Sequence, residues 1–332
     1  MANTNHLLSV RDLVVEYTSD GQVIHAVNGV SFDLEKGKTI GLVGETGAGK
    51  TTIAKSILRI LPDPPARIRG GEIFYQGRDL MKASELEMRS IRGNQISMIF
   101  QEPMTSLNPV YTIGQQITES IRLHMHLSKK DAEARAVELL RKVQIPDAEK
   151  RLKTYPHQLS GGMRQRVMIC MALSCAPKLL IADEPTTALD VTIQAQILDL
   201  IRSLSASEGT SVLFITHDLG VVAEIAQRAI VMYAGSIMEM GEVRTMFQNP
   251  LHPYTQGLLS AIPKLSMPHG EKLYTIRGIV PDLSTLPKGC VFSTRCDKCM
   301  SICREKRPPL RELEDGRRVR CFLMEGGKVV GE

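Results

Sequence analysis

The stretch from Gly44 to Thr51 limits the possible folds more than any other part of the chain. It matches the pattern G-x-x-x-x-G-K-[ST], a loop that joins a buried strand to a helix and binds phosphate groups. The flanking sequence agrees, because residues 39–43 form an apolar run typical of a parallel strand and residues 52–58 have helical spacing. The candidate phosphate-binding residues are Gly44, Glu45, Thr46, Gly47, Ala48, Gly49, Lys50, Thr51 and Thr52. The motif predicts an α/β protein that binds a nucleoside triphosphate.

The residue types in this loop explain how it would hold phosphate. Glycines let successive backbone N–H groups turn inward, and the helix that follows adds a positive partial charge. Lys50 supplies a point charge near the β and γ phosphates, and the Thr51 hydroxyl is a ligand for Mg²⁺.

Length and composition indicate one large domain with an appendage. A chain of 332 residues that is 43% hydrophobic can bury a large core. No apolar run reaches the roughly 18 residues of a membrane-spanning helix, and the first residues lack the charged and apolar regions of a leader. We therefore expect a cytosolic protein that does not itself cross a membrane. The net charge of +5 is mild and spread out, so we expect no nucleic-acid partner.

Three strand-like stretches, 7–17, 26–34 and 70–77, predict an antiparallel β layer. Tyr17 ends the first of them. Its ring either stacks on an adenine held at the phosphate loop or simply occupies a strand face.

A further buried strand is predicted at 96–100, and Gln101 follows at its end, where it can reach a bound Mg²⁺ or the attacking water. Beyond a proline-containing loop, the hydrophobic period changes to that of amphipathic helices between residues 113 and 143. The apolar positions are Ile117, Ile121, Leu123, Leu127, Val137, Leu140 and Val143. We interpret this region as a helical insertion in an α/β protein.

A second candidate anion site begins at Leu159. The sequence Leu159-Ser160-Gly161-Gly162-Met163 leads into a helical stretch, so its glycines leave N–H groups exposed at a positive helix end. This segment resembles the signature sequence of ATP-binding-cassette (ABC) ATPases, in which it follows a phosphate loop at about this distance.

The other motifs of that family follow in the expected order. Residues 179–185 resemble the Walker B strand with Asp183 and Glu184 at its tip, and residues 188–190 resemble the D-loop. Residues 212–217 resemble the strand that ends at the switch histidine, His217. The resemblance covers about residues 7–260. It implies a P-loop ABC cassette with an antiparallel β subdomain, a RecA-like parallel core and a helical subdomain at about 103–165.

The resemblance also implies a role for each motif in phosphoryl transfer, which depends mainly on positioning and charge. Lys50 and the loop amides neutralise the leaving diphosphate. Thr51 and Gln101 ligate Mg²⁺, and Asp183 holds the metal directly or through water. Glu184 is the general base or orients the attacking water.

The remaining roles concern the nucleotide's two ends. His217 contacts the γ phosphate, and Tyr17 stacks on the adenine.

The resemblance also implies a dimer, because in this family each ATP lies between the phosphate loop of one cassette and the signature of another. The chain has one phosphate loop and one signature, so a single copy is an incomplete enzyme. Ser160, Gly161 and Gly162 would then contact the ATP held by a second ABC ATPase subunit, either identical or homologous, with a heterodimer favoured.

A narrower resemblance involves residues 249–259 and 100–109, which are similar to the corresponding regions of ATPase subunits of oligopeptide and dipeptide importers. It implies a cassette at 1–260 and an importer-type extension at 261–332. The implied function is ATP hydrolysis that powers uptake of peptides, or of a related solute such as nickel.

The importer reading implies several partners and a location. Two membrane permease subunits, and indirectly an extracytoplasmic solute-binding protein, would hold the chain at the cytoplasmic face of the membrane. The alternative is a soluble ABC ATPase acting on DNA or ribosomes, but such proteins usually carry coiled-coil insertions or tandem cassettes that this chain lacks.

Five of the seven cysteines lie near the C-terminal end, at Cys290, Cys296, Cys299, Cys303 and Cys321. In a reducing compartment such a group indicates a metal site rather than disulfides. The spacing of all but Cys299 resembles the iron–sulfur tail of the importer subunits, which implies a [4Fe–4S] cluster. Zn²⁺ is the alternative, and which four cysteines bind stays open. Bound metal would replace a core that this short tail cannot build.

Overall fold

The computed structural model describes residues 6–19, 21–101, 106–187, 190–263, 274–324 and 326–330. The chain forms two compact units. The first comprises Met1–Leu7, Leu34–Lys38 and Lys82–Ile215, and the second comprises Leu8–Asp33, Thr39–Met81 and Thr216–Glu332. No helix among the described residues has the length and apolarity needed to cross a bilayer.

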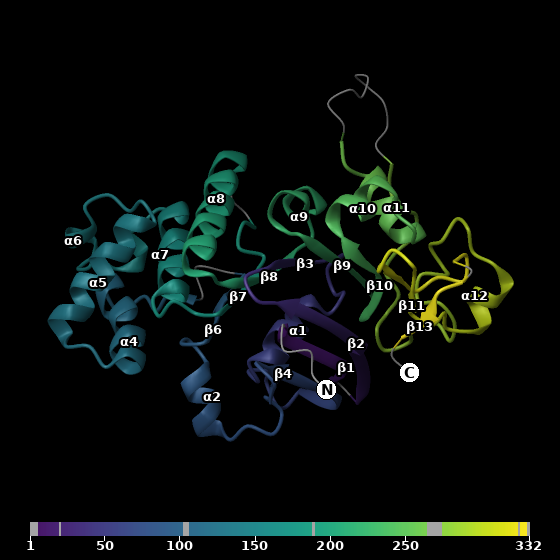
Figure 1. The fold of residues 1–332 in the computed structure, drawn as a ribbon, viewed down its shortest axis with the longest axis horizontal. Coiled ribbons are helices and arrows are strands. Elements are labelled where there is room, and N and C mark those ends of the chain that lie inside the picture. Colours follow the sequence, from purple (N-terminus) through teal and green to yellow (C-terminus); the bar gives the residue numbers. More distant parts are fainter. Residues whose placement is uncertain are drawn as a thin grey trace. The chain divides into compact units, whose positions relative to one another are not determined.

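An antiparallel sheet of four strands lies mostly in the second unit (Figure 1). Its strands, in the spatial order β2-β1-β4-β5, are β2 (Gln22–Glu35), β1 (His6–Ser19), β4 (Ala66–Tyr75) and β5 (Arg78–Asp79). Strands β1 and β4 pair antiparallel from Leu8 opposite Tyr75 to Tyr17 opposite Ala66. The predicted β layer is therefore confirmed, with longer strands than the sequence indicated.

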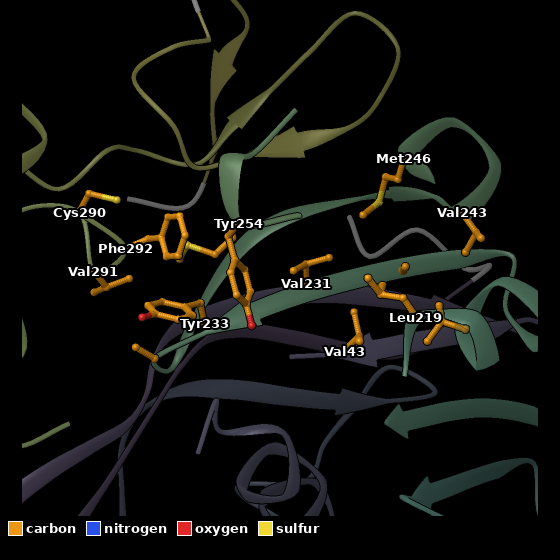
Figure 2. Close-up of a cluster of buried hydrophobic side chains, with 14 of the residues drawn as sticks. Val43, Leu219, Val231, Tyr233, Val243, Met246, Tyr254, Cys290, Val291 and Phe292 are labelled. Atoms are coloured by element: carbon orange, nitrogen blue, oxygen red, sulfur yellow. The ribbon is translucent and has the colours of Figure 1, made fainter. Parts of the chain in front are cut away.

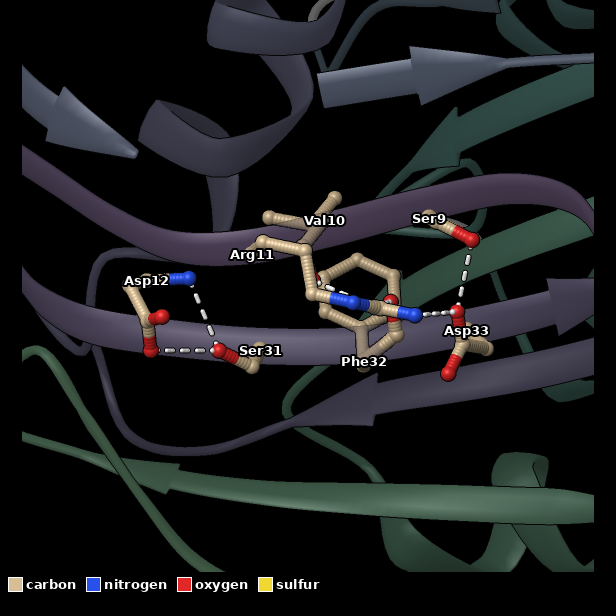
Figure 3. A network of polar contacts seen from close by, with 7 residues as sticks. All are labelled: Ser9, Val10, Arg11, Asp12, Ser31, Phe32 and Asp33. Carbon is tan, nitrogen blue, oxygen red and sulfur yellow. Dashed lines mark hydrogen bonds and ion pairs between the residues drawn. The ribbon is translucent and has the colours of Figure 1, made fainter. Parts of the chain in front are cut away.

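Polar side chains join β1 to β2 at a bulge in the register of β1 (Figure 3). Arg11 and Ser9 both donate to the Asp33 carboxylate, each at 2.6 Å. Asp12 has a φ of 44° and its backbone N–H donates to Ser31 Oγ at 2.8 Å. These bonds fasten β1 to β2 near the point where the register of β1 with β4 shifts, between Arg11 and Val14.

A second group of strands in this unit carries the phosphate loop. Their order is β13-β11-β12-β10-β9-β3, with β3 (Thr39–Val43), β9 (Arg228–Tyr233), β10 (Ser236–Glu242), β11 (Arg311–Glu312), β12 (Arg318–Val319) and β13 (Lys328–Val329). Strand β3 runs parallel to β9, and β10 is antiparallel to both β9 and β12. The C-terminal strands therefore extend the same sheet.

The described helices of this unit are α1 (Lys50–Ile57), α9 (Leu219–Ile225), α10 (Val243–Gln248), α11 (Pro253–Ser260) and α12 (Ser301–Glu305). The strand predicted at 39–43 and the helix predicted just beyond the phosphate loop are both confirmed.

The hydrophobic core of the second unit contains residues from both the cassette and the C-terminal region. Val291 and Phe292 are 1% and 3% exposed and belong to the cluster that includes Val43 and Val231. Figure 2 shows Phe292 beside Tyr233, and their ring centroids are 5.2 Å apart. The expectation that the tail lacks a core was thus incomplete, because the tail buries its few apolar residues against the cassette.

The first unit contains three parallel strands, β6 (Ile96–Ile99), β7 (Leu179–Asp183) and β8 (Ser211–Thr216), in the order β8-β7-β6. Leu179 lies opposite Ile96 on one side and Ser211 on the other. Every residue of β7 is buried, as expected for a central strand covered on both faces.

The described helices of this unit are α2 (Glu85–Ile91), α4 (Ile113–Met125), α5 (Lys129–Lys142), α6 (Ala148–Arg151), η1 (Pro156–Gln158, a 3₁₀ turn), α7 (Gly161–Leu173) and α8 (Val191–Glu208). The predicted helical insertion is confirmed, with Ile117, Ile121 and Leu140 fully buried. Leu123 was assigned to the apolar face and is 65% exposed, because two residues after Ile121 the helix presents its opposite side.

Candidate nucleotide-binding and catalytic site

The phosphate loop connects β3 to α1 in a conformation that requires glycine at two positions. Gly49 has a φ of 93°, and a Cβ there would lie 2.3 Å from the Ala26 carbonyl oxygen. A Cβ on Gly44 would lie 2.2 Å from the Met232 carbonyl oxygen. Side chains at either position would collide with backbone, so the loop can follow this path only with glycine.

Lys50 lies across this loop. It is 5% exposed, and its Nζ donates to the carbonyl oxygens of Gly44 at 2.7 Å and Glu45 at 3.1 Å. Gly49 is the N-cap of α1 and makes no side-chain hydrogen bond to the first backbone N–H groups of the helix, which is its positive end. An ammonium group beside a helix N-terminus favours binding of an anion such as phosphate.

Tyr17 lies near the start of the same helix. Its hydroxyl is 3.4 Å from Thr52 Oγ1, so the C-terminal part of β1 is fixed against the first turn of α1. This places a half-buried ring next to the phosphate loop, as the sequence suggested. Its stacking on adenine stays a prediction.

The acidic pair at the end of β7 belongs to the first unit. Asp183 is 1% exposed, and Glu184 has a φ of 47° that turns the chain out of the strand. The Glu184 carboxylate accepts from Thr187 Oγ1 at 3.0 Å and from Gln101 Nε2 at 3.4 Å. The structure therefore brings together Gln101 and Glu184, two residues that are 83 positions apart.

The signature segment begins helix α7. Ser160 is the N-cap, and its Oγ accepts from the Met163 backbone N–H at 3.4 Å. Gly161 is exposed, and no other group comes within 4 Å of the position that its Cβ would take. Gln165, one turn further on, donates to the Pro185 carbonyl oxygen, which ties the signature helix to the residue after Glu184.

His217 is exposed directly after β8. The turn that carries it is well defined, since Asp218 caps α9 by accepting from the Gly220 N–H at 2.7 Å.

The predicted site residues are divided between the two units. The second unit contains Tyr17, Lys50, Thr51 and His217, and the first contains Gln101, Asp183, Glu184 and the signature. Residues 188–189 of the predicted D-loop and 102–105 after Gln101 lie outside the described residues.

Four of the C-terminal cysteines line one cavity. They are Cys290, Cys296, Cys303 and Cys321, whereas Cys299 does not line it. All five thiols are free, and burial raises the pKa of Cys290 to about 11. The cavity measures about 10 Å³, room for about one water molecule.

These cysteines do not form a metal site in the structure. Among the described residues, no group of three or more His, Cys, Asp or Glu side chains is arranged to hold a metal ion. The donor chemistry suits a thiolate-bound group, but the observed arrangement gives the predicted [4Fe–4S] cluster no support.

Sequence reasoning missed two contacts to the phosphate loop, both at Glu45. Arg295 donates to the Glu45 carboxylate at 2.7 Å, and the Tyr254 hydroxyl accepts from the Glu45 N–H at 3.2 Å. Tyr254 lies within a segment noted for its importer resemblance. No sequence pattern pointed to Arg295, which is 250 residues from its partner.

A strand–loop–helix phosphate site, a strand ending in two carboxylates and a glycine-led signature helix define an ATPase cassette. The family model described as ABC transporter matches residues 27–187, and the model described as oligopeptide/dipeptide transporter, C-terminal region, matches residues 238–303. The chain belongs to the ABC transporter family, whose cassettes hydrolyse ATP.

Curated relatives align along nearly the whole chain. It is 52% identical to a probable peptide ABC transporter ATP-binding protein of Sinorhizobium fredii, covering 95% of this chain and 94% of the relative. It is 50% identical to the oligopeptide transport ATP-binding protein OppD of Bacillus subtilis, covering 98% and 90%. The dipeptide transport ATP-binding protein DppD of the same species is 49% identical, covering 96% and 95%.

Solved structures confirm the predicted cassette fold. A dimeric post-hydrolysis structure of the ATP-binding cassette MJ0796, bound to ADP and phosphate, superposes with a TM-score of 0.64 at 25% identity. The match covers 71% of this chain and 99% of that cassette.

Proposed function

We propose that this chain is the ATP-hydrolysing subunit of an importer for dipeptides or oligopeptides. One observation carries the proposal: a complete set of nucleotide motifs is followed by the peptide-transporter C-terminal region at 238–303. The names of the relatives support peptides as the substrate class. A related solute such as nickel is the alternative within this class of importer.

The test is uptake into proteoliposomes that contain the complete transporter. The chain would be co-purified with its permeases and partner ATPase, and the vesicles would be loaded with ATP. Labelled peptide supplied with its binding protein should accumulate only with ATP. Nickel uptake without peptide uptake would replace the peptide assignment, and failure of both would overturn it.

The proposed reaction is hydrolysis of the γ phosphate. Water attacks the γ phosphorus, the bond to the bridging oxygen of ADP breaks, and the proton of the water passes to the Glu184 carboxylate. Thr187 and Gln101, which both donate to that carboxylate, orient it. Lys50 and the loop amides hold the phosphates. Thr51, Gln101 and Asp183 would hold Mg²⁺, which neutralises phosphate charge when bound.

The proposed assembly contains two ATPase subunits, since each chain has only one phosphate loop and one signature. Exposed Ser160 and Gly161 at the start of α7 suit contact with a partner's nucleotide. The matched MJ0796 cassette is dimeric. A homologous rather than identical partner is our proposal.

A groove on the helical insertion is the proposed docking site for a permease. It has a volume of about 1260 Å³ and is lined by residues of α4, α5 and the preceding loop. Tyr111 and Leu123 line it and are 51% and 65% exposed, with Val110 nearby at 72%. Exposed apolar side chains of this kind favour binding of another protein segment that buries them. We propose that a cytoplasmic segment of the permease binds here and so attaches the chain to the membrane peripherally.

The four-cysteine cavity is the proposed site of a [4Fe–4S] cluster, with Zn²⁺ as the alternative. Two arginines, Arg307 and Arg320, support an anionic occupant. Burial lowers the pKa of Arg320 to about 10 and also lowers the pKa of Arg307, and both interact electrostatically with Cys290. Their side chains donate to uncharged oxygens of Ile237, Pro308 and Ser236. Thiolates bound to metal would compensate these charges.

Metal and sulfide analysis of anaerobically purified protein distinguishes the occupants. A cluster should make the protein brown, with iron and labile sulfide that are lost in Cys290→Ser and retained in Cys299→Ser, because Cys299 does not line the cavity. One equivalent of zinc without sulfide would establish the alternative. Protein without either would remove the metal proposal.

A further inference from the structure

The second residue of the phosphate loop is held by the cysteine-rich C-terminal region. Arg295 Nη1 donates to Glu45 Oε2 at 2.7 Å, and the two side chains are 7% and 26% exposed. Arg295 directly precedes Cys296, one of the four cysteines that line the cavity. A charged contact therefore connects the loop that binds phosphate to the tail.

The position of Arg295 is defined from several sides. Its guanidinium lies 5.6 Å from the centre of the Tyr233 ring and donates to the hydroxyl of that residue at 3.3 Å. Its Nε donates to the Arg277 carbonyl oxygen at 3.0 Å. A planar group with this many fixed partners orients a carboxylate more strictly than a mobile surface cation does.

Glu45 is held at its backbone as well. Its N–H donates to the Tyr254 hydroxyl at 3.2 Å, and its carbonyl oxygen accepts from Lys50 Nζ at 3.1 Å. Tyr254 packs against Phe292 of the tail, with ring centroids 5.3 Å apart. The C-terminal region thus contacts both the side chain and, through Tyr254, the backbone of this residue.

The charges explain why the contact matters for ATP. An unpaired carboxylate in the second position of the loop would repel the incoming phosphates, and Arg295 compensates that charge. We propose that Arg295 is a positioning residue of the phosphate loop, through which the C-terminal cysteine-rich region sets the affinity of this chain for ATP.

The test is direct nucleotide binding to the purified full chain, with Arg295→Gln, Glu45→Gln and the double variant. Loss of a buried charge-assisted contact should weaken ATP binding by about tenfold in Arg295→Gln. In Glu45→Gln the repelling charge is gone, so adding Arg295→Gln should change the affinity little further. The Michaelis constant for ATP should rise more than the turnover number falls.

Arg318→Gln is the matched control, because it removes an ion pair of the same length, 2.7 Å to Glu312, within the tail strands. It should leave ATP affinity unchanged.

Arg295→Lys is a second variant, which tests the proposal even if Arg295→Gln does not fold. Lysine keeps the positive charge but lacks the planar guanidinium, so the ATP affinity of Arg295→Lys should be intermediate. Unchanged affinity in the folded Arg295 variants, or fully additive effects in the double variant, would overturn the proposal. The measurement needs neither permease nor peptide, so its failure would leave the proposed transport function untouched.

Discussion

Glu184 illustrates how a single residue is positioned by unusual backbone geometry. Its φ of 47° is uncommon for a residue with a side chain, and the Glu184 N–H still bonds to the Ile215 carbonyl oxygen at 2.9 Å. The turn ends β7 there and directs the carboxylate toward Thr187 and Gln101. Uncommon conformations of this kind persist where surrounding contacts hold them, often at reactive sites.

We expect Glu184→Gln to bind ATP normally and to hydrolyse it at least about 100-fold more slowly, because an amide cannot accept the proton of water. Turnover would be measured in the assembled transporter, and nucleotide binding in the purified chain. Glu208→Gln, at the end of α8, is the control and should retain activity. Near-normal hydrolysis in Glu184→Gln would remove Glu184 from the catalytic role.

At the scale of elements, the C-terminal region is built onto the cassette sheet and does not fold around a core of its own. Strand β12 pairs with β10, with Val319 opposite Glu239. Phe292 contacts the rings of Tyr233 and His252 as well as Tyr254. A short tail with few apolar residues becomes ordered because it buries them against the cassette.

Phe292→Ala should therefore destabilise the whole second unit and not only the tail. A loss of about 3 to 5 kcal/mol is expected for a fully buried phenylalanine. Ile279→Ala is the matched control in the same region, because Ile279 is 87% exposed and should cost little. Urea unfolding of both variants measures the difference. Equal stability of the two would mean that the tail does not share the cassette core.

At the scale of the whole molecule, the sequence carries one phosphate loop and one signature, and we propose that a second cassette completes each ATP site. Ser160 and Gly161 are exposed at the start of α7, where they are accessible to a partner's nucleotide. Gly161 also has open space around its Cβ position, so a side chain there would leave the fold intact.

We expect Glu184→Gln protein to associate with its partner ATPase when Mg-ATP is present, since slow hydrolysis keeps ATP bound between the two subunits. Gly161→Arg in the same background should remain folded but fail to associate, because a long side chain would fill the surface offered to the partner's nucleotide. Light scattering after size-exclusion chromatography measures both. If association does not depend on ATP or on Gly161, the proposed contact between the signature and the partner's nucleotide is wrong.

The sequence by itself determined the local elements and the order of the motifs. The phosphate loop, the buried strand ending at Asp183 and the helix after Ser160 were all predictable, because each depends on residues that are neighbours in the chain. Hydrophobic periodicity was also sufficient for helices α4 and α5, except for the exposure of Leu123.

Only the tertiary structure decided which distant groups meet. The sequence resemblance already set Cys299 apart from the other tail cysteines, but only the fold shows that the other four line one cavity without it. The contact between Arg295 and Glu45 joins residues 250 positions apart. Such contacts arise from packing a whole unit around one core, and no pattern within either segment encodes them.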